Sequence, residues 1–141
     1  MNRLALVWGI AGLALVASGC ASRPPAVELA VVAREYEFDP STIEAPAGSA
    51  VILTLQNMGQ LEHDITIQEI PMVTMSVAST PMAGHEMGGA EEAPQLHVAA
   101  MMGQTAAITF TPTKPGTYAF SCSVPGHKEA GMAGTLTISA P

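Results

Sequence analysis

The chain has 141 residues, of which 48% are hydrophobic and 12% are charged, and its formal net charge at pH 7 is −7. This length is enough for one domain with a sizeable core. Because binding to nucleic-acid phosphates depends on clustered Lys and Arg, the acidic balance argues against nucleic acid as a partner.

The first twenty residues have the pattern of an export signal. A charged start, Met1-Asn-Arg3, precedes an apolar run over residues 4–16, and the small residues Ala17-Ser-Gly19 follow it. This order predicts a lipoprotein or other secretory signal peptide over residues 1–19. The run is shorter than the roughly 20 apolar residues that span a bilayer, so a permanent transmembrane anchor is the poorer interpretation.

Cys20 follows the small residues directly, and Gly19-Cys20 resembles the end of a bacterial lipobox. The resemblance implies cleavage before Cys20, acylation of its thiol and firm anchoring through several acyl chains. The alternative is ordinary secretion with a spare thiol. We therefore expect an exported protein that is lipid-anchored to the outer face of the cytoplasmic membrane, or is otherwise periplasmic or extracellular. Cys122 is then the one remaining thiol, and in an oxidising compartment a bound metal would protect it.

Residues 20–30 are predicted to be a short tether, stiffened by Pro24-Pro25, and residues 31–141 to be a single domain. Along that domain, short runs of alternating apolar and polar residues are separated by Gly and Pro turn signals. About seven such runs predict an antiparallel β-sandwich or barrel. The runs lie near residues 35–38, 43, 51–56, 63–67, 108–111, 118–122 and 135–139.

A stretch over residues 71–102 interrupts the strand pattern and is rich in Met, Ala, Gly and Pro. Loops of this length inside a compact domain are usually functional or disordered. We interpret the stretch as a Met-rich insertion that is unstructured or packs loosely on the sandwich, and we interpret His97 within it as structural. The alternative is a weak secondary copper site in the insertion, with the candidate ligands Met82, His85 and Met87.

Three donors that suit soft metals follow at even spacing near the C-terminus: Cys122, His127 and Met132. Cys with two His and a weakly held Met is the ligand set of blue copper sites. Met is a poor ligand for zinc, and a structural zinc site prefers four strong donors. The motif therefore favours copper, with a second imidazole supplied from upstream by His63.

His63 and Cys122 are expected to point into the domain near the ends of their strands. Alternate residues of a strand share one face, so His63 lies on the face of Ile65 and Ile67, and Cys122 lies on the face of Phe120. The segment after Cys122 can then fold over both side chains and bring the other two donors to them.

The chain resembles the cupredoxins in four features. These are the Cys-x4-His-x4-Met motif, the Gly-Thr-Leu-Thr run at 134–137, the Pro-Gly-Thr-Tyr run at 115–118 and the isolated upstream His. The similarity is greatest to the small auracyanin-like and plastocyanin-type proteins and covers residues 34–139. It implies an all-β Greek-key sandwich of about eight strands. It also implies one type 1 copper per chain, bound by two imidazole Nδ1 atoms, a thiolate and an axial thioether. The implied ligands are His63, His127, Cys122 and Met132.

One position beside the first ligand differs from the family pattern. The family often has Asn directly after the first histidine, where its side chain hydrogen-bonds the segment that follows the cysteine, and Asp64 stands there in this chain. Ser123 is the expected partner of Asp64. Hydrogen bonds of this kind tune a bound metal.

The resemblance implies a one-electron carrier and not an enzyme, because four protein ligands leave no open position on the metal for a substrate. Its redox partners would dock near His127, which would lie toward the surface, and the protein would be a monomer held at the membrane by its lipid anchor. The alternative is an extracytoplasmic protein that binds or delivers copper through the Met- and His-rich insertion. A copper oxidase or nitrite reductase is excluded, since the chain lacks the His-x-His and His-Cys-His runs that such enzymes need.

Overall fold

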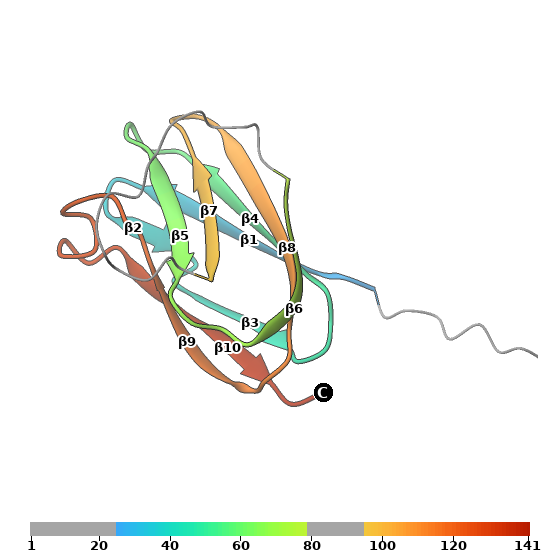
Figure 1. Cartoon of the computed structure of the whole chain (residues 1–141). Helices are drawn as coiled ribbons and strands as arrows, with labels where there is room; N and C mark the ends of the chain where they lie inside the picture. The colour runs from blue at the N-terminus through green and yellow to red at the C-terminus, as the bar shows by residue number, and fades with distance from the viewer. Residues whose placement is uncertain (1–24, 79–94) are drawn as a thin grey trace, which may run out of the picture.

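The structure is a computed structural model and describes residues 25–78 and 95–141. Within these two ranges every regular element is a β-strand, and the strands form two five-stranded sheets packed as a sandwich (Figure 1). The first sheet has the order β2-β1-β4-β8-β6 and the second has the order β3-β10-β9-β5-β7. The strands are β1 (Val27–Arg34), β2 (Glu37–Asp39), β3 (Thr42–Pro46), β4 (Val51–Asn57), β5 (His63–Ile67), β6 (Met72–Ala78), β7 (Leu96–Ala100), β8 (Thr105–Pro112), β9 (Gly116–Ser121) and β10 (Ala133–Ser139).

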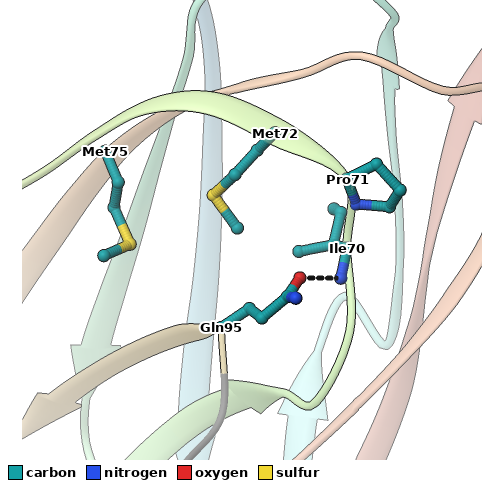
Figure 2. A pocket seen from close by; sticks show the side chains of 5 residues that line it. All are labelled: Ile70, Pro71, Met72, Met75 and Gln95. Atoms are coloured by element: carbon teal, nitrogen blue, oxygen red, sulfur yellow. Dashed lines mark hydrogen bonds between the residues drawn. The ribbon is translucent and has the colours of Figure 1, made fainter.

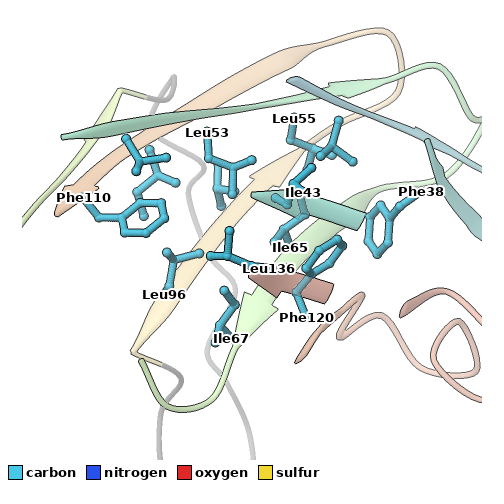
Figure 3. Close-up of a cluster of buried hydrophobic side chains, with 14 of the residues drawn as sticks. Phe38, Ile43, Leu53, Leu55, Ile65, Ile67, Leu96, Phe110, Phe120 and Leu136 are labelled. Atoms are coloured by element: carbon cyan, nitrogen blue, oxygen red, sulfur yellow. The ribbon is translucent and has the colours of Figure 1, made fainter. Parts of the chain in front are cut away.

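The core lies between the two sheets, where alternate residues of each strand meet (Figure 3). In β4, Leu53 and Leu55 are fully buried, while the residues on either side of Leu53 are half-buried. Phe38 packs against Phe120 with ring centroids 5.3 Å apart and planes inclined by 63°. Each large apolar side chain that is removed from water contributes roughly 1.5–3 kcal/mol, so the core firmly holds the strands that carry the site.

The all-β sandwich expected from the alternating runs is confirmed, with ten strands in the described ranges. It is not purely antiparallel as predicted, because β1 pairs in parallel with β4 and β3 pairs in parallel with β10. The tether expected over residues 20–30 ends earlier than predicted, because β1 begins at Val27. β1 pairs in parallel with β4 over residues 27–33, and its inward residues Val31 and Ala33 are fully buried. The alternation through these positions makes the segment a strand, although its parallel partner cannot be inferred from local sequence.

The segment 71–102, expected as an insertion without regular structure, contains two edge strands. β6 pairs with β8 at one edge of the first sheet, and β7 pairs with β5 at one edge of the second. β7 has the alternating burial of a core strand. β6 pairs with a register shift between Met72 and Met75, and this irregularity obscures its pattern in the sequence.

Residues 1–24 and 79–94 lie outside the described ranges. The predicted signal peptide, Cys20 and the candidate secondary ligands Met82, His85 and Met87 therefore lie outside them too. None of the described residues belongs to a helix long and apolar enough to cross a bilayer.

Several turns meet at one end of the sandwich, around the start of β5 and the segment that joins β9 to β10 (Figure 1). The buried side chain of Asn57 ties two of these turns together. Its amide group donates hydrogen bonds to the carbonyl oxygens of Leu61 and Ala100 at 2.7 and 2.8 Å, and its carbonyl oxygen accepts one from the N–H of Gly59 at 2.9 Å. We call this the site end; it comprises residues 35–36, 57–63, 100–104 and 122–133.

Candidate metal centre

Three donor atoms converge inside the site end. The sulfur of Cys122 lies 4.0 Å from Nδ1 of His63 and 3.5 Å from Nδ1 of His127, and the three ligand atoms lie within 4.8 Å of one another. All three side chains are buried. Both imidazoles therefore turn the nitrogen that the cupredoxin resemblance implies, Nδ1, toward the thiol sulfur.

The pairing of β5 with β9 brings two of these donors together from distant parts of the chain. His63 is the first residue of β5 and Cys122 follows the last residue of β9. The two strands are antiparallel neighbours through Thr66 and Ser121. Both side chains are buried and their donor atoms converge, in agreement with the shared inward facing that strand parity predicts.

Backbone hydrogen bonds close the segment from Cys122 to Met132. The N–H of Cys122 donates to the carbonyl oxygen of Met132 at 3.1 Å, and the N–H of Met132 donates to the carbonyl oxygen of His127 at 2.9 Å. Gly126 and Gly131 have φ angles of 85° and 105°, which residues with a side chain rarely adopt. These bonds and turns fix the three donor-bearing residues relative to one another.

Met132 is fully buried and belongs to the same hydrophobic cluster as Cys122. Its thioether is therefore shielded from water within the core. Two imidazoles, one thiol and a buried thioether suit copper, whereas zinc prefers four strong donors. The residues present thus fit a type 1 copper ion.

Gly59 covers the outer side of the His63 ring. A Cβ atom at this glycine would lie 2.7 Å from Nε2 of His63, which is closer than real Cβ atoms approach. Nε2 is buried and has no hydrogen-bond partner among the described residues. With Nδ1 facing the metal, the proton of the neutral imidazole resides on Nε2, beneath the backbone of Gly59.

Burial sets the protonation of the donors before metal binds. Desolvation lowers the pKa of His63 below its ordinary value, and the nearby His127 lowers it further. Desolvation also raises the pKa of the Cys122 thiol. The metal-free site therefore holds a neutral His63 and a protonated thiol at neutral pH, and copper binding must release the thiol proton.

The structure pairs Asp64 with Ser123, the partner expected from the sequence. The N–H of Ser123 donates to Oδ1 of Asp64 at 2.7 Å, and the Ser123 hydroxyl donates a hydrogen bond to Oδ2. The hydroxyl of Thr66 donates to Oδ1 at 3.2 Å, and Nε2 of His97 lies 3.5 Å from Oδ2. Burial acts to raise the pKa of Asp64, but the hydrogen bonds from His97 and Ser123 outweigh it and hold the pKa below its ordinary value.

The sequence interpretation leaves Thr66 and His97 outside the site, whereas the structure places both against Asp64. These two residues face each other in the register of β5 and β7. The pairing of Thr66 with His97 is missed in the sequence when 71–102 is regarded as one insertion without strands. The apolar–polar alternation on both sides of His97 is the signal that reveals the strand.

His127 is less exposed than the resemblance implies. Only 4% of its surface is exposed, and the ring of Tyr36 packs edge-on against it, with centroids 5.3 Å apart and planes inclined by 84°. Tyr36 itself is half-exposed. Part of this imidazole is therefore covered by an aromatic ring that reaches the solvent.

Known proteins with similar sequences are copper proteins. Residues 25–139 match the family described as copper binding proteins, plastocyanin/azurin family. Two relatives named copper-resistant cuproprotein CopI are 30% identical over 108 residues in Rubrivivax gelatinosus and 29% identical over 133 residues in Pseudomonas aeruginosa. Each match covers 77% of this chain, which spans 63% of the length of the first relative and 74% of the second.

Solved structures with the same fold include dithionite-reduced auracyanin from Roseiflexus castenholzii. The TM-score is 0.62 at 22% identity, over 80% of this chain and 97% of that protein. This likeness shows the cupredoxin-like sandwich, and the family match spans most of the chain. The protein therefore belongs to the plastocyanin/azurin family of copper binding proteins, and within the described residues its type 1 copper site is formed by His63, Cys122, His127 and Met132.

Proposed function

We propose that the protein carries single electrons between membrane-associated redox partners. The observation that supports this best is the closed site, since none of the four ligand side chains is more than 4% exposed. When bound, copper supplies one-electron exchange, and a ligand set filled by protein leaves no open position for a substrate. The role is that of a carrier and not of an enzyme.

The fold also holds the ligands still. Sheet pairing positions His63 and Cys122, and backbone hydrogen bonds close the segment from Cys122 to Met132. Densely packed cores resist movement of their side chains. The same ligand geometry can therefore serve both oxidation states, and little rearrangement accompanies the exchange of an electron.

We infer that a redox partner docks at the site end, near His127. Tyr36 packs against that imidazole and is half-exposed, so it offers a short route from the surface to the ligand. The net charge of −7 favours a basic partner. Exposed apolar side chains on the two turns that Asn57 joins would contact it: Met58, Leu61, Met101 and Met102.

The carrier role is tested by loading the protein with Cu(II) and cycling it with a reductant and an oxidant. We expect one copper per chain, an intense visible absorption band, and repeated cycling without loss of metal. Absorption spectra and the copper content after each cycle measure this. Protein that is colourless, or that releases its copper on reduction, would contradict the carrier role.

Copper binding or delivery in copper resistance is a second candidate function, favoured by the two relatives that are named copper-resistant cuproproteins. Met72 and Met75 line a shallow pocket at the start of β6, together with Gln95, the first described residue after 79–94 (Figure 2). The candidate ligands in that segment are Met82, His85 and Met87. The number of Cu(I) ions bound under reducing conditions separates the functions, since a tight second ion favours copper handling.

We propose that the chain is exported and anchored through an acylated Cys20, on the support of the sequence pattern over residues 1–20. The change Cys20→Ser should block lipoprotein processing and move the protein from the membrane fraction to the soluble fraction. Mass spectrometry of the mature N-terminus checks this directly. An unmodified Cys20, or an N-terminus beyond it, would refute the anchor.

A further inference from the structure

The carboxylate of Asp64 connects the copper site to a titratable side chain nearer the surface. Asp64 follows the ligand His63 in the chain, and its partner Ser123 follows the ligand Cys122. The N–H and the hydroxyl of Ser123 both donate to this carboxylate, and Nε2 of His97 lies 3.5 Å from its Oδ2. A continuous chain of contacts therefore runs from the imidazole of His97 to the residue bonded to the thiolate ligand.

The two ends of this chain of contacts differ in their access to solvent. The side chain of Asp64 is 6% exposed, whereas that of His97 is 39% exposed. The register explains the difference, because His97 lies on the edge strand β7, opposite Thr66, between two residues that face the core. Protons from solvent therefore reach His97 while Asp64 stays shielded.

Among the described residues, the charged groups that act on His97 are acidic. Asp64 of β5 contacts it, and Glu62, which precedes β5, acts on it through charge. β4 and β8, which also pack against β7, carry no charged side chain. The hydrogen bond to Asp64 raises the pKa of His97 most, burial opposes this, and the charges of Asp64 and Glu62 raise it further. The imidazolium therefore persists to a higher pH than in an isolated histidine.

We propose that His97 is a positioning residue of the copper centre: acting through Asp64 and Ser123, it makes the reduction potential of the copper depend on the surrounding pH. His97 is not itself a ligand. The proposal rests on the type 1 copper site and is independent of whether the protein carries electrons or handles copper.

The direction of the effect follows from the charges. The negative charge of Asp64 favours the oxidised, more positive state of the site, and the imidazolium of His97 cancels part of that influence. When His97 loses its proton, the carboxylate is no longer compensated and the oxidised state is favoured. The reduction potential should therefore step down as the pH rises through the pKa of His97.

Two substitutions at His97 separate charge from shape. The reduction potential of the copper-loaded full chain is measured from about pH 5 to pH 9, which brackets the ordinary pKa of histidine. His97→Gln keeps a hydrogen-bond donor without a charge, and its potential should stay at the high-pH level of the wild type throughout. His97→Lys keeps a permanent positive charge in this range, and its potential should stay at the low-pH level. A flat wild-type profile would overturn the proposal.

Two substitutions at acidic residues test the route of the effect. Glu62→Gln is the matched control, because Glu62 also acts on both His97 and Cys122 through charge. It should raise the potential and preserve the pH step. Asp64→Asn should raise the potential and remove the step although His97 is still present. A wild-type step that persists in His97→Gln or in Asp64→Asn would overturn the proposal.

The coupling is also measurable without copper. In the metal-free protein the amide resonance of Ser123 reports its hydrogen bond to Asp64, and we expect its chemical shift to titrate together with the imidazole of His97. His63 and His127 are present in both the wild type and His97→Gln. A titration of the Ser123 amide shift that disappears in the variant is therefore caused by His97. An unchanged Ser123 titration in His97→Gln would refute the coupling, whatever the properties of the copper-loaded protein.

Discussion

The thioethers of Met132 and Met75 lie in two regions of this molecule and in opposite surroundings. At the site end, Met132 is fully buried and its segment is closed by backbone hydrogen bonds. In the edge strand β6, Met75 is 51% exposed and lines a shallow pocket with Met72 and Gln95 (Figure 2). The side-chain oxygen of Gln95 is already engaged within this pocket, since it accepts a hydrogen bond from the N–H of Ile70 at 2.8 Å.

The difference between the regions shows that donor type alone does not define a metal site. Ordering a flexible chain costs roughly 1–2 kcal/mol per residue that is fixed. At the site end, sheet pairing and core burial order the ligand residues during folding, so an ion that binds there does not have to order them. β6 is held on one side only, as the edge of its sheet, so an ion beside it would have to order much of its own surroundings.

The largest difference between the two regions is expected for Cys122→Ser, measured by the visible absorption of the copper site. A hydroxyl cannot replace the polarizable thiolate that gives type 1 copper its colour, so the intense visible band should disappear. Met75→Ser is the matched control, because it removes a sulfur from the exposed pocket and should leave the band unchanged. Absorption spectra of the two copper-loaded variants test this prediction. A coloured Cys122→Ser protein would show that another sulfur is the ligand.

Gly59→Ala should have the next largest effect, because its Cβ would lie 2.7 Å from Nε2 of His63 and the ring must move. We expect copper affinity to fall about 10- to 100-fold, as it does when the support of a ligand is disturbed. The metal-free protein should lose about 1–3 kcal/mol of unfolding free energy through overpacking. Chelator competition and denaturant titrations measure the two quantities.

Gly48→Ala is the control for Gly59→Ala. Gly48 has a φ of 80°, and a Cβ atom added to it would meet nothing within 4 Å, so alanine there strains only the backbone, by roughly 1 kcal/mol. Stability should fall while copper affinity stays constant. An equal loss of affinity in both variants would mean that general destabilisation, and not the His63 ring, controls the metal.

Met132→Gln should keep the copper and lower its reduction potential, because an oxygen donor stabilises Cu(II) more than a thioether does. The matched change in the exposed region, Met75→Gln, should leave the potential unchanged. Voltammetry of both proteins gives the comparison. An unaltered potential in Met132→Gln would show that the thioether is packing material and not an axial ligand.

The smallest effect is expected when residues 79–94 are replaced by a short Gly/Ser linker that spares β6 and β7. The visible band and the potential should remain nearly unchanged, since the site end is complete without this segment. Copper stoichiometry under reducing conditions is measured with and without it. A second Cu(I) ion that binds tightly and is lost together with Met82, His85 and Met87 would show that tight binding does not require the ordered site end. That result would support copper handling.

The local features of the site could be predicted from the sequence, because they depend on neighbours in the chain. Strand parity predicts the inward side chains of His63 and Cys122, and the resemblance to the cupredoxins implies the pairing of Asp64 with Ser123. The pairing of His97 with Thr66 depends on the register of two separate strands. The contact of Tyr36 with His127 likewise depends on how a distant turn folds over the ligand segment, so neither could be read from a local pattern.

His63 and Cys122 are separated by 59 positions in the chain, so folding is what brings these two donors together. In an unfolded chain Cys122, His127 and Met132 share one short segment that is far from His63, whereas the sandwich adds the imidazole of His63 once β5 and β9 have paired. Copper therefore binds the native chain in preference to the unfolded one and shifts that equilibrium by mass action. A bound ion would therefore stabilise the contact between β5 and the segment that follows β9.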